Sequence, residues 1–501
     1  MSRFDLRSLP LTSIGSALFF VWSLVILLTY GTAFLRDPDT FWHIRSGEWI
    51  LAHGAVPTVD SYSYTMAGQP WIAKEWLSQV ILAVTYDVGG WHAVILLSAC
   101  AVAVAGVLLC RFLLDYLRYP YAAGITAVSL VIASPHFLAR PHILSFPVMV
   151  LYFTVLIRAV DRKDDPPFVL LPLMALWANL HGGFSLGIVL SGFLSLQAMV
   201  EVGSARRLRS ILLYGGFMAG LLLASLVHPY GAEPLLMTKR LLDLGPGLTM
   251  LSEWTAFNAQ ENGIHAAYFE LLILLALWSG ARIPLLRITP VMVLVHLMLK
   301  HVRGIPIFAL LAPAFLAGPL AGQFPFIAAR PSPGGEPGSA RVRAATWAAA
   351  AVLAALAGFG FVALVKDPQN ETTKIVPREA LEAARAAGLT GKVLNDYGYG
   401  GYLIFEGVKT FVDGRAELFG RAFLDRWRKA TDLNGPETLP ALADAYGADW
   451  TIHPAGSVAA HQFRMDPGWR LVHKDDVAVV YARQPKSAPG TAEAGKVTEA
   501  K

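Results

Sequence analysis

The fold is decided by a long apolar stretch that ends in charge, residues 12–43, which read TSIGSALFFVWSLVILLTYGTAFLRDPDTFWH. The apolar part is long enough to cross a hydrocarbon core of roughly 30 Å as a helix. Asp37 and Asp39 then lie at the boundary between membrane and water. A carboxylate at such a boundary is costly unless it is hydrated or paired, so it is a candidate functional group. The alternative is an Asp-Pro turn that caps the next helix for local reasons.

The composition extends this interpretation to the whole chain. Of its 501 residues, 55% are hydrophobic and only 15% are charged, and the mean hydropathy is +0.49. Soluble domains are about a quarter charged, so a soluble fold is excluded. We expect a polytopic α-helical membrane protein with about eleven membrane-spanning helices. The apolar runs lie near 12–34, 90–113, 121–138, 142–160, 167–181, 183–200, 210–228, 266–280, 285–299, 303–320 and 344–365.

The net charge of +5 is explained by basic residues that are concentrated in the loops. Alternate loops are basic, as Arg111, Arg118 and Arg158 illustrate. Basic loops face the cytoplasm, so we expect a cytoplasmic N-terminus and an outer location for everything after Lys366. This distribution explains the charge without a nucleic-acid partner.

The chain divides by composition into a membrane part and an outer part. We expect a transmembrane domain over 1–366, with a polar, aromatic first outer loop at 35–76. Residues 367–483 are richer in charge and predict a small extracytoplasmic α/β domain. Its expected elements are a helix at 377–387 and short β-runs at 392–394, 409–412 and 477–481. The tail 484–501 has the composition of a disordered segment.

Polar clusters gather on the outer side when the chain is threaded in this way. That side receives Asp37, Asp39 and His43 after the first span, Arg140 and His142 between the third and fourth, and His181 between the fifth and sixth. It also receives Glu253 in a long loop, and Lys300, His301 and Arg303 between the ninth and tenth spans. The asymmetry predicts an outward-facing cavity that binds a lipid-linked anionic substrate.

Each cluster also has a simpler interpretation. Histidines at helix ends often satisfy backbone carbonyls, and Lys or Arg can anchor a helix at the interface. Guanidinium and ammonium groups are equally the usual partners of phosphate oxygens. Histidine with carboxylate suits zinc, but the sequence contains no His-Glu-x-x-His spacing, so a divalent metal stays an open question.

The acidic pair suits general base catalysis. A carboxylate can take the proton of an acceptor hydroxyl as that oxygen attacks an anomeric carbon, while cations stabilise the departing phosphate. One well-placed Asp is enough for this chemistry. A second carboxylate could orient the acceptor or hold a divalent metal.

The segment Asp39-Thr40-Phe41-Trp42 resembles the Asp-Glu-Ala-Tyr type of motif in the GT-C superfamily of polyprenyl-phosphate-sugar-dependent glycosyltransferases, and in particular the bacterial RgtA/B/C/D-like members. Thr40 stands at the place that is usually acidic. The resemblance implies a GT-C-like transmembrane fold in a bacterial inner membrane, a polyprenyl-phosphate-linked sugar donor, and Asp39 as the base with Asp37 assisting. The chain as a whole resembles a subgroup of bacterial membrane proteins that has motifs like those at 37–43, 140–142, 179–183 and 395–415.

The outer domain offers a second set of candidates. Tyr397, Asp413 and Arg415 are polar residues next to apolar runs, and strand ends in α/β sheets are where ligands bind. They are candidates for binding the acceptor. The alternative is that Asp-Gly and Gly-Gly are ordinary turn residues.

The favoured hypothesis is therefore a glycosyltransferase that moves a sugar from a polyprenyl-phosphate donor to a glycan, lipid or protein acceptor outside the membrane. Two hypotheses from other classes remain, a lipid or glycan transporter or flippase and a non-catalytic cell-envelope assembly protein. A transporter predicts charged pathways through the midplane or a repeated half, and neither is visible in the sequence.

Overall fold

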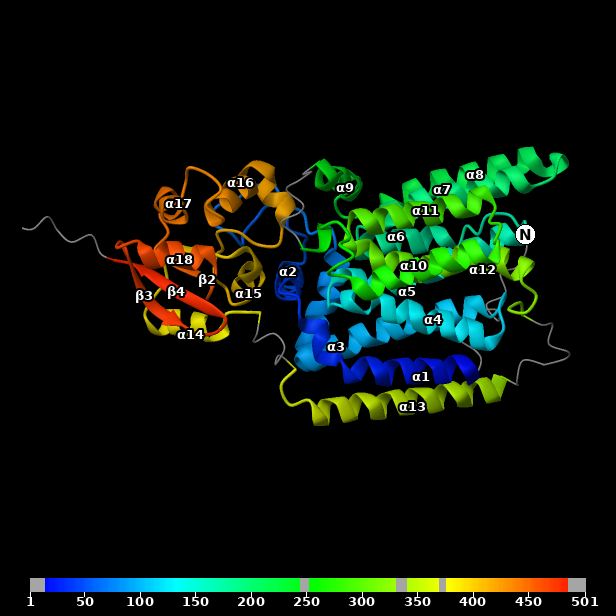
Figure 1. Ribbon diagram of the computed structural model, residues 1–501, viewed down its shortest axis with the longest axis horizontal. Coiled ribbons are helices and arrows are strands. Elements are labelled where there is room, and N and C mark those ends of the chain that lie inside the picture. The colour runs from blue at the N-terminus through cyan, green and yellow to red at the C-terminus, as the bar shows by residue number, and fades with distance from the viewer. Residues whose placement is uncertain (1–13, 244–251, 330–339, 369–374, 485–501) are drawn as a thin grey trace, which may run out of the picture. The chain divides into compact units, whose positions relative to one another are not determined.

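The computed structural model describes residues 14–243, 252–329, 340–368 and 375–484. The chain forms two compact units, drawn in Figure 1. The helical unit comprises residues 1–60 and 68–372, and the second unit comprises 61–67 and 373–501. A short piece of the first polar loop thus belongs to the second unit. The tail that we expect to be disordered lies outside the described residues, apart from Gln484.

Within the described residues, each apolar run expected to span the membrane corresponds to a helix. These helices are α1 (Ile14–Thr29), α3 (Trp76–Leu113), α4 (Tyr119–Ala133), α5 (Pro141–Asp161), α6 (Leu170–Leu180), α7 (Phe184–Glu201), α8 (Ser204–Ser225), α10 (Gly263–Ser279), α11 (Leu285–Lys300), α12 (Ile305–Gln323) and α13 (Ala340–Leu364). The unit also contains α2 (Asp39–His53), α9 (Glu233–Asp243) and the 3-10 turns η3 (Gly31–Leu35), η4 (Ser134–His136), η6 (Ser252–Trp254) and η7 (Val302–Gly304).

Length and composition make this unit a polytopic membrane protein. Among the residues that the structure describes, six helices are long and apolar enough to cross a membrane, namely α3, α5, α7, α8, α12 with η7, and the part of α13 from Thr346 to Leu364. Phe19–Thr29 of α1, α6 and α10 are shorter apolar helices. The expected polytopic helical fold is therefore confirmed.

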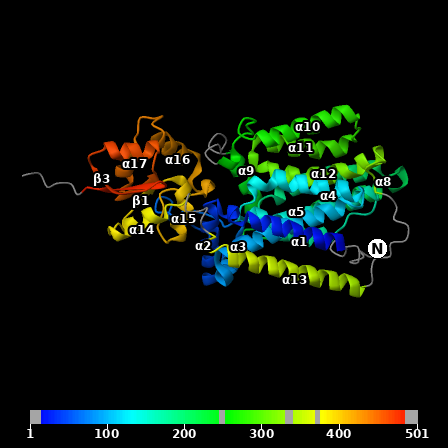
Figure 2. The same ribbon diagram turned by 60° about the horizontal axis from the view of Figure 1, so that its bottom comes forward.

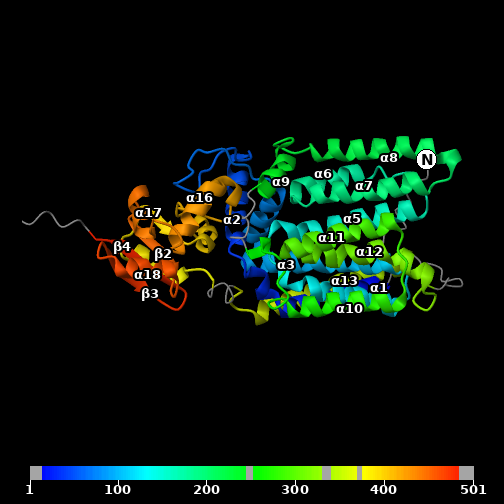
Figure 3. The same ribbon diagram turned by 45° about the horizontal axis from the view of Figure 1, so that its top comes forward.

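Neighbouring helices of this unit pack lengthwise against one another. α1 packs on α3 and α13, α3 on α5, α7 on α8, and α12 on α4 and α11. Figure 2 shows α1 beside α13, and Figure 3 shows α7 beside α8. Successive helices alternate in direction, which sends the connecting loops to two opposite ends. One end, here called the carboxylate end, carries Asp37, Arg140 and Glu253, and the other carries Asp115 and Arg158.

Helix α2 lies in the first polar loop. It ends where Gly54 adopts a left-handed conformation with φ 59°, which L-residues rarely adopt. Gly47 lets α2 approach α3 closely, because a Cβ at this position would lie 2.1 Å from the Gln79 carbonyl oxygen. The middle of α2 thus lies close against the start of α3.

The second unit is an α/β domain built on a four-stranded sheet of order β1-β2-β4-β3. β1 (Val393–Asn395) pairs in parallel with β2 (Trp450–Pro454), and β4 (Ala478–Arg483) is antiparallel to both β2 and β3 (Trp469–Lys474). The helices are α14 (Arg378–Ala386), α15 (Gly400–Phe405), α16 (Ala416–Thr431), α17 (Leu439–Tyr446) and α18 (Val458–Met465), with the 3-10 turn η9 (Tyr397–Tyr399). α14 and α18 pack on strands of this sheet.

One expected strand is absent from this sheet. Residues 409–412 lie outside the four strands, and Thr410 instead forms an isolated bridge with Ser63 of the inserted segment Ser61–Ala67. The amide of Tyr64 donates to the Thr410 carbonyl at 3.1 Å, and the Thr410 amide donates to the Tyr62 carbonyl at 3.1 Å. The apolar run at 409–412 is therefore buried by pairing with a distant loop.

Candidate active site

The guanidinium of Arg140 is the centre of a polar cluster at the carboxylate end. Its Nη1 lies 2.9 Å from Asp37 Oδ2 and 2.9 Å from Glu253 Oε2, and its Nη2 lies 3.0 Å from Asp39 Oδ2. Their side chains are only 15–26% exposed. One planar cation thus holds three carboxylates from two separate loops.

Local structure brings these groups together. Asp39 is the first residue of α2, and its amide donates to Asp37 Oδ1 at 2.8 Å, so Asp37 satisfies a free amide at the start of the helix. Arg140 precedes Pro141 at the start of α5, and the Ala139 amide donates to the Phe34 carbonyl at 2.7 Å. The local interpretation of Asp37 as a capping residue and its place in the cluster are therefore compatible.

Glu253 connects the cluster to a second cation. Its Oε1 lies 3.3 Å from Arg303 Nη1, and the guanidinium of Arg303 stacks over the Trp254 ring at 4.4 Å from the centroid. The Trp254 carbonyl lies 2.8 Å from His301 Nδ1, which ties η6 to the end of α11. Arg303 is 33% exposed and is the more accessible of the two arginines.

The protein shifts the pKa values of Asp39, Glu253 and Arg140 in different ways. Burial raises the pKa of Asp39 to about 7, with Arg140 opposing the shift and the neighbouring carboxylates adding to it. Burial also pushes the pKa of Glu253 upward, but Arg140 and Arg303 lower it to about 2. Burial would lower the pKa of Arg140, yet the surrounding carboxylates raise it well above its usual range. One carboxylate of the cluster is thus poised to exchange a proton near neutral pH.

The predicted histidines near the cluster mostly bind protein atoms. Gln79 Nε2 donates to His43 Nδ1 at 3.2 Å, and His142 Nε2 donates to the His136 carbonyl at 3.0 Å. His181 accepts from the Gly183 amide at 3.1 Å through Nδ1, and its Nε2 lies 3.5 Å from Glu75 Oε1. Of these three histidines, His142 is the one that satisfies a backbone carbonyl, and a role of His43, His142 and His181 in substrate binding stays a prediction.

In the part of the chain that the structure describes, no group of three or more His, Cys, Asp or Glu side chains is arranged to hold a metal ion. The carboxylates that converge at this end surround a guanidinium instead.

The other predicted site residues lie in different surroundings. Lys300 is an exposed residue at the end of α11. In the second unit, Tyr397 packs against Trp427, and Asp413 and Arg415 are fully buried and joined at 2.7 Å. Thr410 Oγ1 also donates to Asp413 at 2.9 Å. The motif at 395–415 therefore contains a buried polar network, and its role in acceptor binding stays a prediction.

Sequence reasoning missed a polar group at the start of α3. Glu75 faces His181, the Lys74 carbonyl accepts from His228 Nε2 at 3.1 Å, and Trp76 Nε1 donates to Asn179 Oδ1 at 2.6 Å. The sequence does contain a signal for this group. Lys74 and Glu75 lie directly before a long apolar helix, just as Asp37 lies directly after one.

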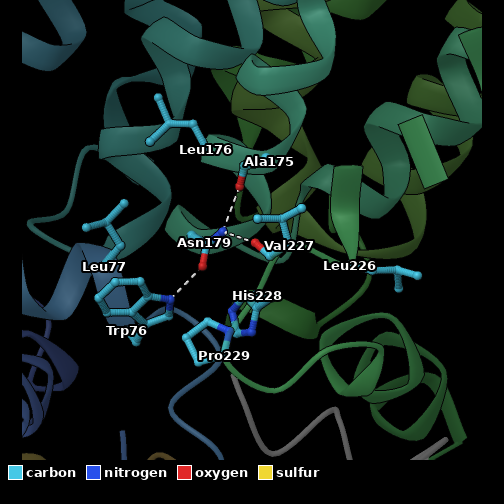
Figure 4. Close-up of a pocket in the computed structure, with 9 residues that line it drawn as sticks. All are labelled: Trp76, Leu77, Ala175, Leu176, Asn179, Leu226, Val227, His228 and Pro229. Atoms are coloured by element: carbon cyan, nitrogen blue, oxygen red, sulfur yellow. Dashed lines mark hydrogen bonds between the residues drawn. The ribbon is translucent and has the colours of Figure 1, made fainter. Parts of the chain in front are cut away.

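An apolar pocket of about 610 Å³ opens beside this group (Figure 4). Its walls come from the start of α3, one face of α6 and the end of α8. The lining residues are Trp76, Leu77, Ala175, Leu176, Asn179, Leu226, Val227, His228 and Pro229.

Fold and site together define a polytopic α-helical membrane protein with a charged cluster at one end of its bundle. No protein-family model matches the chain, and no curated protein matches it either. Among solved structures, it is similar to ArnT from Cupriavidus metallidurans bound to undecaprenyl phosphate, with 14% identity, a TM-score of 0.49, and coverage of 94% of this chain and 98% of that chain. The apo state of the same protein gives 14% identity, a TM-score of 0.48, and coverage of 93% and 98%.

Proposed function

We propose that this protein is a membrane glycosyltransferase that moves a sugar from a polyprenyl-phosphate donor to an extracytoplasmic glycan or lipid acceptor. The proposal rests on one observation above all, the convergence of the Asp37, Asp39 and Glu253 carboxylates on Arg140 at the end of a membrane-spanning bundle, where burial raises the pKa of Asp39 to about 7. A general base works best when its pKa lies near the operating pH. Asp39 in this role takes the proton of the acceptor hydroxyl.

The rest of the cluster supplies the other parts of the reaction. Asp37 and Arg140 hold Asp39 in place through the helix start and the 3.0 Å ion pair. Arg303, which is partly exposed and has a 3.3 Å contact with Glu253, is the cation best placed to meet a departing phosphate. The donor class follows from the resemblance of the Asp39-Thr40-Phe41-Trp42 segment to GT-C enzymes.

The same proposal includes an orientation in the bacterial inner membrane. The distribution of basic loops supports a cytoplasmic N-terminus and an outer location for the loop that carries Asp37 and Asp39 and for the residues after Lys366. A flippase or a cell-envelope assembly protein would give no sugar transfer in the following test.

The test is sugar transfer by the full chain in lipid nanodiscs, supplied with a panel of polyprenyl-phosphate sugars and membrane-glycan extracts and followed by mass spectrometry. Wild type is compared with Asp39→Asn and Asp37→Asn. Asp115→Asn is the matched control, because Asp115 forms a 2.6 Å ion pair with Arg158 at the opposite end of the bundle.

We expect transfer to be lost in Asp39→Asn, weakened in Asp37→Asn and retained in Asp115→Asn, with all four proteins folded. Equal transfer by wild type and Asp39→Asn would exclude Asp39 as the base. Absence of transfer with every donor, from folded wild type, would contradict the proposed activity and favour transport or assembly.

A further inference from the structure

The indole N–H of Trp42 is a buried donor without an acceptor next to the proposed base. Trp42 is only 7% exposed, and its Nε1 makes no hydrogen bond in the part of the chain that the structure describes. An unpaired buried donor is costly, so each one in a native protein needs an explanation.

Helix geometry places this N–H beside Asp39. The two residues are three positions apart at the start of α2, a spacing that makes side chains neighbours on one face of a helix. The Trp42 indole comes close enough to the Asp39 carboxyl to lower its pKa, although the contact lacks the geometry of a full hydrogen bond. The carboxyl of the base is therefore an acceptor within reach of this donor.

Packing holds the indole in place. Its ring lies 3.7 Å from the ring of His43 between centroids, and it packs edge-on against Trp71 at 6.3 Å. Both neighbouring rings are themselves buried, and His43 is held by Gln79 Nε2 at 3.2 Å. A small movement of the Asp39 side chain, rather than of the ring, would complete the hydrogen bond.

The charged groups that face Asp39 act on it in opposite directions. Arg140 favours the ionised form of Asp39, whereas the carboxylates of Asp37 and Glu253 favour the protonated form. Arg140 pairs with all three carboxylates, so its charge is shared among them. A neutral N–H donor stabilises an ionised carboxylate without adding a charge to the cluster.

Other titratable groups nearby act on the partners of Asp39. Lys74, just before α3, lowers the pKa of His43, and Glu75 raises the pKa of Arg140. Burial holds the pKa of His43 well below its usual range, so its ring stays neutral at pH 7. Asp39 is therefore the group beside the indole that titrates near neutral pH.

We propose that Trp42 is the positioning residue of the base, and that its indole N–H completes a hydrogen bond to Asp39 when the carboxyl is ionised. The inference rests on the proposed function and adds the group that orients the base and keeps its ionised form available. An ionised carboxylate has about four lone pairs, which can accommodate Arg140, the indole and an acceptor hydroxyl together.

The experiment removes the N–H and keeps the ring. Benzothienylalanine, in which sulfur replaces the indole nitrogen and its hydrogen, is incorporated at position 42 of the full chain, and Trp42→Phe is the conventional counterpart. The same analogue at Trp49, which stacks on His53 at 4.0 Å farther along α2, is the matched control. Protonation of Asp39 is followed by pH-difference infrared spectroscopy of its carbonyl band, assigned with Asp39→Asn, in a detergent without ester groups. Sugar transfer is measured over the same pH range.

We expect the midpoint of the Asp39 band to rise by about one pH unit when the N–H is removed at position 42, because a hydrogen bond to a charged group is lost. The ionised fraction at pH 7 then falls about fivefold, and transfer should fall by the same factor and recover at higher pH. The analogue at Trp49 should leave both the midpoint and the pH–rate profile unchanged.

An unchanged midpoint in the folded protein with the analogue at position 42 would overturn the inference. A rise in KM with an unchanged pH–rate profile would also overturn it, because the indole would then bind substrate rather than Asp39. Transfer with an unchanged midpoint would leave the proposed function standing and remove only this inference. The infrared midpoint does not depend on activity, so a raised midpoint without any transfer would support the pairing of Trp42 with Asp39 and contradict only the proposed function.

Discussion

Removal of the central cation should unfold the carboxylate end in a pH-dependent way. Arg140→Met keeps much of the side-chain volume but leaves three carboxylates, from Asp37, Asp39 and Glu253, without their shared partner at 2.9–3.0 Å. Breaking a buried ion pair by removal of one partner costs about 3–5 kcal/mol. Because the carboxylates are 15–26% exposed and can take up protons, we expect the lower end of this range at pH 7.

The dependence on pH follows from Glu253. Its pKa in the folded protein is lowered to about 2 by its cations, so its contribution to stability is present above its ordinary pKa of 4.5 and is lost as the pH falls through about 2. The Arg140→Met variant lacks most of that contribution. The difference between wild type and variant should therefore be largest near neutral pH and should shrink as the solution is acidified.

The assay is detergent-induced unfolding of the full chain across this pH range. Arg158→Met removes a comparable cation from Asp115 at the opposite end and is the matched control. Arg140→Lys should fall between wild type and Arg140→Met, because one ammonium cannot reproduce the planar contacts to three carboxylates. Glu253→Gln should restore part of the stability of Arg140→Met. A loss that does not vary with pH, or no restoration in the double variant, would refute this account of the cluster.

Three further predictions test other parts of the structure. If Asp39 is the base, sugar transfer should fall about tenfold per pH unit below its pKa of about 7, because the protonated carboxyl cannot accept a proton, and a flat pH–rate profile would contradict this role. Gly47→Ala should destabilise the protein by about 1–3 kcal/mol through overpacking of α2 against α3 in a thermal melt, whereas Gly124→Ala, in a helix with open space around it, should not. His453→Leu should stabilise the second unit by about 1–3 kcal/mol, since both nitrogens of this fully buried ring lack a hydrogen-bond partner in the described structure. Hydrogen exchange of the second unit measures this change, and His461→Leu on the surface should have little effect in the same measurement.

The membrane helices were predictable because their signal is local. An apolar run of the right length must satisfy its backbone as a helix in lipid, whatever its neighbours are. The end of α2 also has a local signal, because Gly54 is a residue type that readily adopts the left-handed conformation in which helices often end. The position of the polar loops at one end was predictable from the number of membrane spans that precede each loop.

The pairings within the cluster were not predictable in this way. That Arg140 binds Asp37, Asp39 and Glu253 together depends on how helix packing brings three loops together, which spacing along the chain does not encode. The run at 409–412 had the composition of a strand, and its partner turned out to be Ser63 rather than a neighbouring strand. The expected strand at 409–412 is therefore wrong, because Thr410 forms only an isolated bridge.

The insertion of residues 61–67 into the second unit imposes an order on biosynthesis. The Thr65 hydroxyl donates to the Phe411 carbonyl at 2.7 Å across a separation of 346 residues, and Tyr64 reaches the Val393 carbonyl across 329. Ribosomes add about 5–20 residues per second, so this segment waits roughly 20–70 s for its partners. The intervening helices must enter the bilayer before the segment can dock. A nascent chain that stops before residue 393 therefore leaves the backbone groups of this aromatic segment without their native partners, so we expect premature termination or truncation of this protein to promote aggregation.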